Sequence, residues 1–239
     1  MNKIMLFLVK GKTDEKSLAL TISRQINGVR FFVIKTDITS DCHTTIDNVE
    51  HLIYERIKFF LSENPQFEFS DIESVIQITD TDGTFIPENI IKYEESVEKI
   101  YYESDSVLTN NIEETKNRNI HKAEILRKLC SLAYINNEEK SQNKDNEKVK
   151  YRIYYMSCNL EHVLHNSPNV ATKEEKVNLA NQFRNETVNN PDKLRNILFD
   201  PRIDCSGDYK YSWEFIQKGI NSIKRKSNFS NFFSEYIDI

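Results

Sequence analysis

The chain has 239 residues, of which 38% are hydrophobic and 29% are charged, and its formal net charge is −5. This length suits one large domain or a core domain with an appended part, and the acidic balance excludes a protein whose whole surface is basic. No apolar run approaches the ~20 residues needed to cross a bilayer, and the first residues lack a signal-peptide pattern, so we expect a cytoplasmic protein with no membrane association.

The first predicted strand is the apolar run Ile4–Val9, which ends at Lys10 and Gly11. Thr13 can cap a helix that carries Asp14 and Glu15 in its first turn, where acidic side chains complement the helix dipole. A strand, a glycine turn and a capped helix are typical of the opening of a doubly wound α/β domain.

The next elements continue this alternation. Arg30–Lys35 is a second predicted strand, residues 45–61 show helical apolar spacing, and a third strand ends at Asp80. Connections of helix length between strands favour a parallel sheet with right-handed crossovers. The predicted fold is therefore an α/β, Rossmann-like parallel sheet.

The third strand ends in Asp80-Thr81-Asp82-Gly83. Side chains at i and i+2 of an extended backbone lie on one face, so both carboxylates can converge beyond the carboxyl end of the strand, where α/β sheets bind ligands. Carboxylate oxygens suit Mg²⁺ or Mn²⁺ better than zinc. A solvated turn is the alternative, since Asp and Gly are common in turns, and these residues alone leave both interpretations open.

Two segments together resemble the Toprim family, the metal-dependent fold shared by topoisomerases, primases, small ribonucleases and phage-defence nucleases. They are Val9-Lys10-Gly11-Lys12-Thr13-Asp14-Glu15, after the first strand, and Asp80-Thr81-Asp82-Gly83. The resemblance covers roughly the first half of the chain. It implies a Toprim-type sheet, metal ligation by Asp80 and Asp82, and catalytic roles for both.

One position departs from the family pattern: Lys10 stands where the family has a glutamate at the end of the first strand. A charged lysine cannot coordinate Mg²⁺, and its ammonium repels the ion. Lys10 can pair with Asp80 or Asp82 in place of a cation, or it can contact a scissile phosphate as a catalytic group. Lys12 and Thr13 are the predicted phosphate contacts.

A further carboxylate follows the predicted strand Tyr151–Met156. Asn159-Leu160-Glu161 resembles the Asn-x-x-Glu-like segment of Toprim-like defence proteins that are encoded beside an ABC-type ATPase, and the resemblance implies a catalytic role for Glu161. Alternatively, Asn159 caps a helix and Glu161 complements its dipole.

The rest of the chain gives the predicted domain organisation. We expect a Toprim-like domain over residues 1–165, with a polar loop at 136–150, and a helical C-terminal region over 166–239 packed on it. Predicted elements include an edge strand near 101–105 and helices over 121–135, 173–185, 192–198 and 212–222, with a last helix docked by Phe232, Phe233 and Tyr236. The four cysteines are far apart, which indicates neither a disulfide framework nor a zinc motif.

The functional prediction is a divalent-metal-dependent nuclease, a bacterial phage-defence effector that cleaves DNA or RNA and uses Mg²⁺ or Mn²⁺. The alternative is a non-catalytic Toprim-like subunit that binds a partner ABC-type ATPase, a phage protein or nucleic acid, with Lys10 as the mark of lost activity. A homo-oligomer is compatible with both. A response-regulator-like signalling domain is a third alternative, but its acceptor Asp and later strand-end Lys are not clearly placed.

Overall fold

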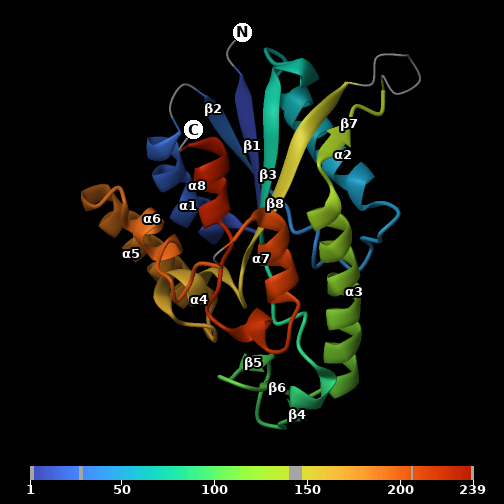
Figure 1. The fold of residues 1–239 in the computed structure, drawn as a ribbon, viewed down its shortest axis with the longest axis vertical. Helices are drawn as coiled ribbons and strands as arrows, with labels where there is room; N and C mark the ends of the chain where they lie inside the picture. Colours follow the sequence, from blue (N-terminus) through green and yellow to red (C-terminus); the bar gives the residue numbers. More distant parts are fainter. Residues whose placement is uncertain (1–2, 27–28, 140–146, 206, 238–239) are drawn as a thin grey trace.

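The computed structural model describes residues 3–26, 29–139, 147–205 and 207–237. The fold is α/β, as predicted, and is built on a five-stranded sheet in the order β2-β1-β3-β8-β7 (Figure 1). The strands are β1 (Ile4–Val9), β2 (Arg30–Lys35), β3 (Ile72–Asp80), β7 (Tyr134–Asn136) and β8 (Lys148–Met156). The first four in the sheet are parallel, and β7 pairs antiparallel with β8 at the edge.

Helices cover both faces of this sheet, which makes a three-layered, Rossmann-like arrangement (Figure 1). One face packs against α2 (Val49–Glu63), α3 (Ile112–Ser131) and α7 (Tyr209–Ile216). The other packs against α1 (Lys12–Gln25), α4 (Leu160–His165), α5 (Lys173–Asn189), α6 (Lys193–Leu198) and α8 (Ser230–Tyr236). Short 3₁₀ turns lie at Phe69–Asp71, Glu88–Ile90 and Asn221–Ile223. The region after residue 165 is helical and contributes to both layers.

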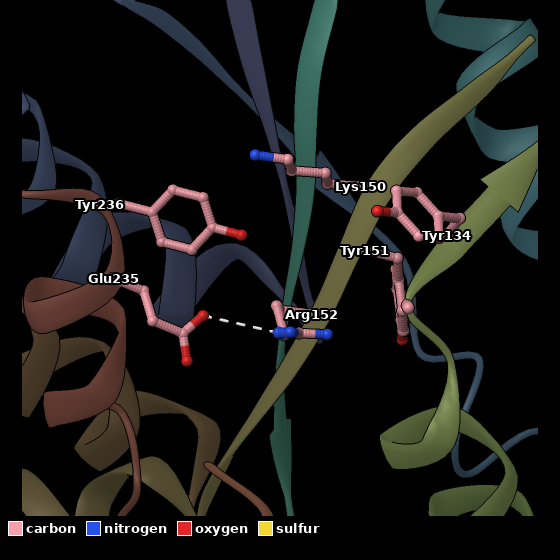
Figure 2. A pocket seen from close by; sticks show the side chains of 7 residues that line it. Tyr134, Lys150, Tyr151, Arg152, Glu235 and Tyr236 are labelled. Atoms are coloured by element: carbon pink, nitrogen blue, oxygen red, sulfur yellow. Dashed lines mark ion pairs between the residues drawn. The ribbon is translucent and has the colours of Figure 1, made fainter. Parts of the chain in front are cut away.

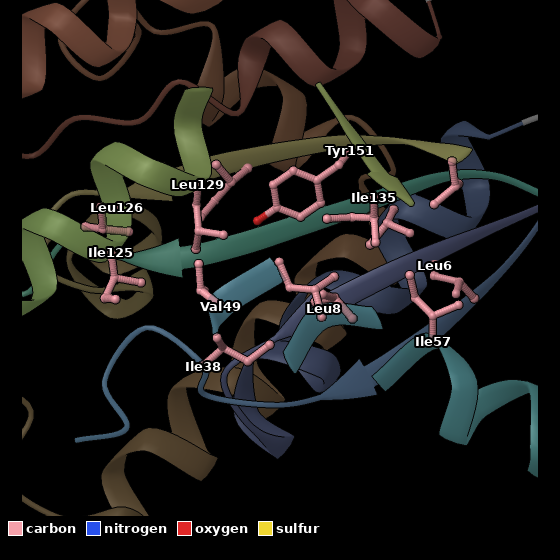
Figure 3. Close-up of a cluster of buried hydrophobic side chains, with 14 of the residues drawn as sticks. Leu6, Leu8, Ile38, Val49, Ile57, Ile125, Leu126, Leu129, Ile135 and Tyr151 are labelled. Atoms are coloured by element: carbon pink, nitrogen blue, oxygen red, sulfur yellow. The ribbon is translucent and has the colours of Figure 1, made fainter. Parts of the chain in front are cut away.

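β1, an inner strand of the sheet, shows why the sequence runs apolar without alternation. Every residue of β1 is buried: Ile4, Leu6 and Leu8 belong to the core on the α2/α3 side, and Met5, Phe7 and Val9 to the core on the α1/α8 side. A strand covered on both faces needs apolar residues at every position. Figure 3 shows the first of these cores, where Leu6 and Leu8 lie beside side chains from α2 and α3.

A second, three-stranded sheet lies beyond the carboxyl end of the main sheet (Figure 1). Its order is β4-β6-β5, formed by β4 (Ile91–Tyr93), β5 (Tyr101–Tyr102) and β6 (Val107–Thr109). A small apolar cluster that includes Ile91, Val107 and Ile223 anchors it. The predicted edge strand near residue 101 is therefore β5, but it belongs to this second sheet.

Side chains from the C-terminal region complete the outer edge of β8. β7 pairs only with residues 148–150 of that strand. Farther along, Ile153 N–H donates to the Tyr209 hydroxyl at 3.4 Å, and the Trp213 indole donates to Ile153 O at 3.2 Å. Tyr155 N–H donates to Asn228 Oδ1 at 2.7 Å. Since buried backbone groups need partners, these contacts replace a neighbouring strand.

Several predicted boundaries are wrong: the helices expected at 45–61, 173–185 and 212–222 are α2, α5 and α7, whose bounds differ from these. Three further differences have a local reason. α1 begins at Lys12 with Gly11 rather than Thr13 as its N-cap, and the Asp14 carboxylate, at the third position of the helix, accepts the Gly11 N–H at 3.2 Å. α3 begins at Ile112 rather than His121, because Asn111 caps it by accepting Glu114 N–H. It also ends at Ser131, and the predicted end of this helix lies in β7 instead.

The third concerns the predicted polar loop at 136–150. Lys148–Lys150 already pair with β7 and β3 as part of β8, whereas residues 140–146 lie outside the described part of the chain. Within the described residues, no helix has the length and apolar character that crossing a membrane requires.

Candidate functional site

The carboxyl end of β3 places Asp80 and Asp82 on the turn that leaves the sheet. Asp80 is buried, and its Oδ1 accepts the backbone N–H of Leu160 at 3.0 Å. Asp82 and Gly83 both have left-handed backbones, with φ of 48° and 68°. Aspartate and glycine tolerate this region better than most residues. The turn therefore directs both carboxylates back toward the ends of the parallel strands.

Lys10 lies at the centre of these carboxylates. Its Nζ is 3.4 Å from Asp80 Oδ2, 3.4 Å from Asp82 Oδ2 and 3.9 Å from Asp37 Oδ2. The three acids come from the ends of β3 and β2, which flank β1 on either side. Parallel neighbours end at the same edge of a sheet, and this brings the three segments together.

A second lysine reaches the site from α3. Lys122 has 2% of its side chain exposed, and its Nζ lies 2.5 Å from Asp82 Oδ2 and 3.1 Å from Ser40 Oγ. One turn earlier on the same helix, Arg118 donates to the backbone carbonyl of Asp82 at 2.7 Å. The Tyr102 hydroxyl donates to the same carbonyl at 3.1 Å. Asp82 is therefore held at both its side chain and its backbone.

Two further acids complete the group on the α1 and α4 side. Glu161 has 7% of its side chain exposed and pairs with Lys176 of α5 at 3.3 Å. Asp14 lies close enough for its charge to interact with those of Glu161 and Lys10. We call Asp14, Asp37, Asp80, Asp82 and Glu161, with Lys10, Lys122 and Lys176, the acidic site. Its carboxylates outnumber its ammonium groups.

The pKa values of Asp80 and Asp82 are shifted in opposite directions. Burial favours neutral Asp82, but the Lys122 and Lys10 ammonium groups outweigh burial and hold its pKa well below its usual range. Burial raises the pKa of Asp80 to about 7, although the Lys10 ammonium opposes this rise. Burial and the nearby Glu161 carboxylate likewise raise the pKa of Asp14 to about 6.

Lys10 remains charged in this setting. Burial opposes its charge, but the carboxylates of Asp80 and Asp82 outweigh burial and raise the Lys10 pKa above its ordinary value. The ammonium group is therefore a permanent part of the site at neutral pH.

The predicted phosphate contacts have a different setting. Lys12 is exposed at the first position of α1, and the Thr13 hydroxyl donates to Asp14 Oδ1 at 3.4 Å. Glu15 pairs with Lys35 at 3.2 Å on the surface. Thr13 thus touches the acidic site through Asp14, and phosphate binding by Lys12 and Thr13 stays a prediction.

The sequence carries a pattern that indicates a buried Lys122. Lys122 stands on the stripe that continues at Ile125, Leu126 and Leu129, the buried face of α3. A lysine in an apolar stripe needs a buried partner, and here the partner is Asp82. Asp14 and Asp37 follow the predicted glycine turn and second strand directly, so strand order alone could have assigned them to this edge.

Two other features lie apart from the acidic site. Asp41, Cys42 and His43 are exposed and place one donor atom each within 4.8 Å of the others. A pocket of about 310 Å³ lies at the opposite end of β8, lined by Tyr134, Lys150, Arg152, Glu235 and Tyr236 among others. Figure 2 shows Arg152 facing Glu235 across it, with 3.5 Å between their charged atoms.

The ligand atoms and the negative charge of the acidic site are suited to a hard divalent cation. Its donors are carboxylate oxygens, which Mg²⁺ and Mn²⁺ prefer, and its five carboxylates outnumber its three ammonium groups. The carboxylates surround the Lys10 ammonium, and in the described residues they do not form a set of three with oxygens within 4.8 Å of one another. A cation would thus have to displace Lys10 and draw the acids together.

Comparisons of the chain with protein-family models, with curated proteins and with solved structures return no match.

Proposed function

We propose that the chain is a Toprim-like, divalent-metal-dependent nuclease. The observation that carries this proposal is the acidic site: five carboxylates from four segments of the chain meet at the carboxyl edge of the parallel strands and exceed the ammonium groups beside them. Excess buried negative charge is unfavourable unless a cation or protons neutralise it, so the site is suited to take up Mg²⁺ or Mn²⁺.

Asp80 and Asp82 would hold the metal, with Glu161 as a further ligand. When bound, the metal would neutralise phosphate charge and activate a water as nucleophile. Lys10 and Lys12 would contact the phosphate, and Asp14 can hold a proton near neutral pH because its pKa is raised to about 6. A pKa near the working pH is what general acid–base catalysis requires.

A non-catalytic Toprim-like subunit is the second candidate, and one specific observation favours it. The Lys10 ammonium stands 3.4 Å from both Asp80 and Asp82, where it already supplies positive charge. In this candidate the lysine replaces the metal permanently, and the protein binds a partner ATPase, a phage protein or nucleic acid. The phage-defence role and the ABC-type ATPase partner rest in both candidates on the family resemblance.

Calorimetric titration with Mn²⁺, paired with cleavage assays on single- and double-stranded DNA and RNA, separates the candidates. The nuclease proposal expects wild-type binding and cleavage that Asp80→Asn with Asp82→Asn abolishes. Asp41→Asn is the matched control, because it neutralises an exposed carboxylate outside the acidic site. If Mn²⁺ still binds to the variant with Asp80→Asn and Asp82→Asn but not to Asp41→Asn, the metal site lies at residues 41–43 instead. No Mn²⁺ binding and no cleavage by wild type would favour the non-catalytic subunit.

A further inference from the structure

A cleft opens beside the acidic site, between the second sheet and the segment before α5. It is bounded by residues 96–102 on one side and 168–171 on the other, with Asn159 and Lys176 also lining it, and its volume is about 580 Å³. We call it the Tyr101 cleft. A volume of this size lies in the range of small-molecule and nucleotide sites.

Hydrogen bonds cross-link the two walls of the cleft. Tyr102 N–H donates to Asn169 Oδ1 at 2.8 Å, and Asn169 Nδ2 returns a bond to Tyr102 O at 2.8 Å. Lys99 Nζ spans from the same wall to Ala171 O at 3.2 Å. Because the walls are cross-linked, a ligand meets a preformed surface, which lowers the entropic cost of binding.

Two residues that line the cleft also contact the acidic site. Tyr102, in one wall, donates its hydroxyl to the backbone of Asp82. Lys176 lines the cleft and also pairs with Glu161. A ligand group in the cleft therefore lies next to the carboxylates, in the position of a nucleotide that neighbours the phosphate under attack.

The chemistry of the lining matches a nucleotide unit. Tyr101 is 46% exposed, so its ring has a free face on which a base can stack. Lys99 and Lys176 keep N–H donors beyond their contacts with Ala171 O and Glu161, and these donors can reach a phosphate, while Glu98 is the one carboxylate among the described residues of the lining. A base has a free face only where the strand is unpaired, and a duplex is too wide to enter a cleft of this volume.

We propose that the Tyr101 cleft binds a nucleotide of single-stranded nucleic acid, with its base stacked on Tyr101, next to the acidic site. This rests on the proposed nuclease function for the role of the acidic site, but binding in the cleft needs no metal. The net charge of −5 and the presence of only two lysines in the described cleft lining, Lys99 and Lys176, predict that stacking supplies most of the affinity. The salt dependence should accordingly be shallow, with a slope of about −0.7 per phosphate contact.

The test is fluorescence anisotropy with labelled oligothymidylate, oligouridylate and a blunt DNA duplex, in EDTA so that neither metal nor cleavage contributes. We expect the single strands to bind better than the duplex, and Tyr101→Ala to weaken them at least about fivefold, as loss of one base–aromatic stack requires. Tyr93→Ala is the matched control, since Tyr93 is a tyrosine of the same small sheet, is 61% exposed and lies outside the cleft lining. Val170→Trp, which fills the cleft, should weaken binding as Tyr101→Ala does.

Three outcomes would overturn the cleft assignment: no oligonucleotide binding by wild type, equal losses in Tyr101→Ala and Tyr93→Ala, or a duplex that binds as tightly as the single strands. Failure of the nuclease proposal is a separate result. If Mn²⁺ does not bind but oligonucleotides bind through Tyr101, the cleft stands without catalysis. If cleavage occurs and Tyr101→Ala changes neither binding nor KM, the cleft assignment fails and the nuclease stands.

Discussion

The Lys122 ammonium lies 2.5 Å from Asp82 Oδ2, and α3 leaves 2% of that lysine side chain exposed. A buried charge is stable when it is paired with an opposite charge. Removing one partner of such a pair leaves the other as a buried charge without a counter-charge. The pair therefore ties α3 to the turn after β3 and fixes the electrostatic state of the acidic site.

Lys122→Met should destabilise the protein strongly. The substitution leaves the buried Asp82 carboxylate with Lys10 as its remaining ammonium partner, and we expect a loss of about 3–5 kcal/mol in the free energy of unfolding. Lys128→Met, on the same helix, removes a pair with Glu50 in which both side chains are more than one-third exposed, and should cost less than about 1 kcal/mol. Urea denaturation of both variants measures the difference, and equal losses would show that the buried pair has no special weight.

The raised pKa of Asp80 makes the free energy of unfolding decrease as the pH rises. Burial raises its pKa from 3.8 to about 7, so the folded state binds the proton more tightly than the unfolded state. That contribution to stability is complete below about pH 4 and is lost as the pH rises through about 7. Asp14, whose pKa is raised to about 6, adds a change of the same sign.

We therefore expect Asp80→Asn to flatten the fall in stability between about pH 4 and 7, and to raise the free energy of unfolding at neutral pH by on the order of 1 kcal/mol. The amide oxygen can still accept the Leu160 N–H. Urea unfolding at a series of pH values compares this variant with wild type and with Asp41→Asn. A slope as steep as that of wild type would mean that Asp80 is ionised with its ordinary pKa.

Lys10→Glu should strengthen the binding of Mn²⁺ or Mg²⁺ by about tenfold or more, since it replaces a cation among the carboxylates with an oxygen ligand. Lys12→Glu makes the same change of charge two residues away, at an exposed position, and should have a smaller effect. Calorimetric titration measures both. If wild type cleaves nucleic acid and Lys10→Glu abolishes cleavage, the lysine stabilises charge in the transition state and the non-catalytic candidate fails.

Gly83→Ala should cost more than Gly219→Ala, although both glycines have left-handed backbones with φ of 68° and 55°. A methyl group at Gly83 would lie 3.0 Å from Tyr102 Cε1 and 3.1 Å from Ile223 Cγ2, whereas at Gly219 it would meet nothing within 4 Å. We expect about 1–2 kcal/mol at Gly219 from the backbone alone and about 1–3 kcal/mol more at Gly83 from overpacking. Thermal unfolding of the two variants provides the comparison, and equal costs would rule out a steric role for Tyr102.

The sequence predicts β1, β2 and β3 well because each is a mainly apolar run, whereas β7 lies at the end of the predicted helix 121–135 and β8 begins three residues earlier than expected. β1 and β2 have the predicted bounds, and β3 ends at Asp80 as expected. Strand order then brings Lys10 beside Asp80 and Asp82. The sequence does not predict the first turns of α3, because they are polar. That half of the helix is stabilised by the Asn111 cap and by contacts with the second sheet, and neither produces a helical repeat of apolar residues.

The remainder of the acidic site depends on tertiary contacts that spacing does not encode. Lys122 is 40 residues from Asp82 along the chain, and Lys176 meets Glu161 only because α5 packs on α4. The Tyr101 cleft likewise needs residues 96–102 and 168–171 to lie side by side, which only a folded chain provides.

The side chains that hydrogen-bond to the outer edge of β8 determine where the protein can be truncated. Tyr209, Trp213 and Asn228 hydrogen-bond to the outer edge of that strand. A fragment that ends near residue 165 would expose bare peptide groups along β8, and an open strand edge is a template for pairing with another chain. Such a fragment should therefore self-associate or precipitate on expression, so the boundary between the sheet and the C-terminal helices is not a usable site for truncation.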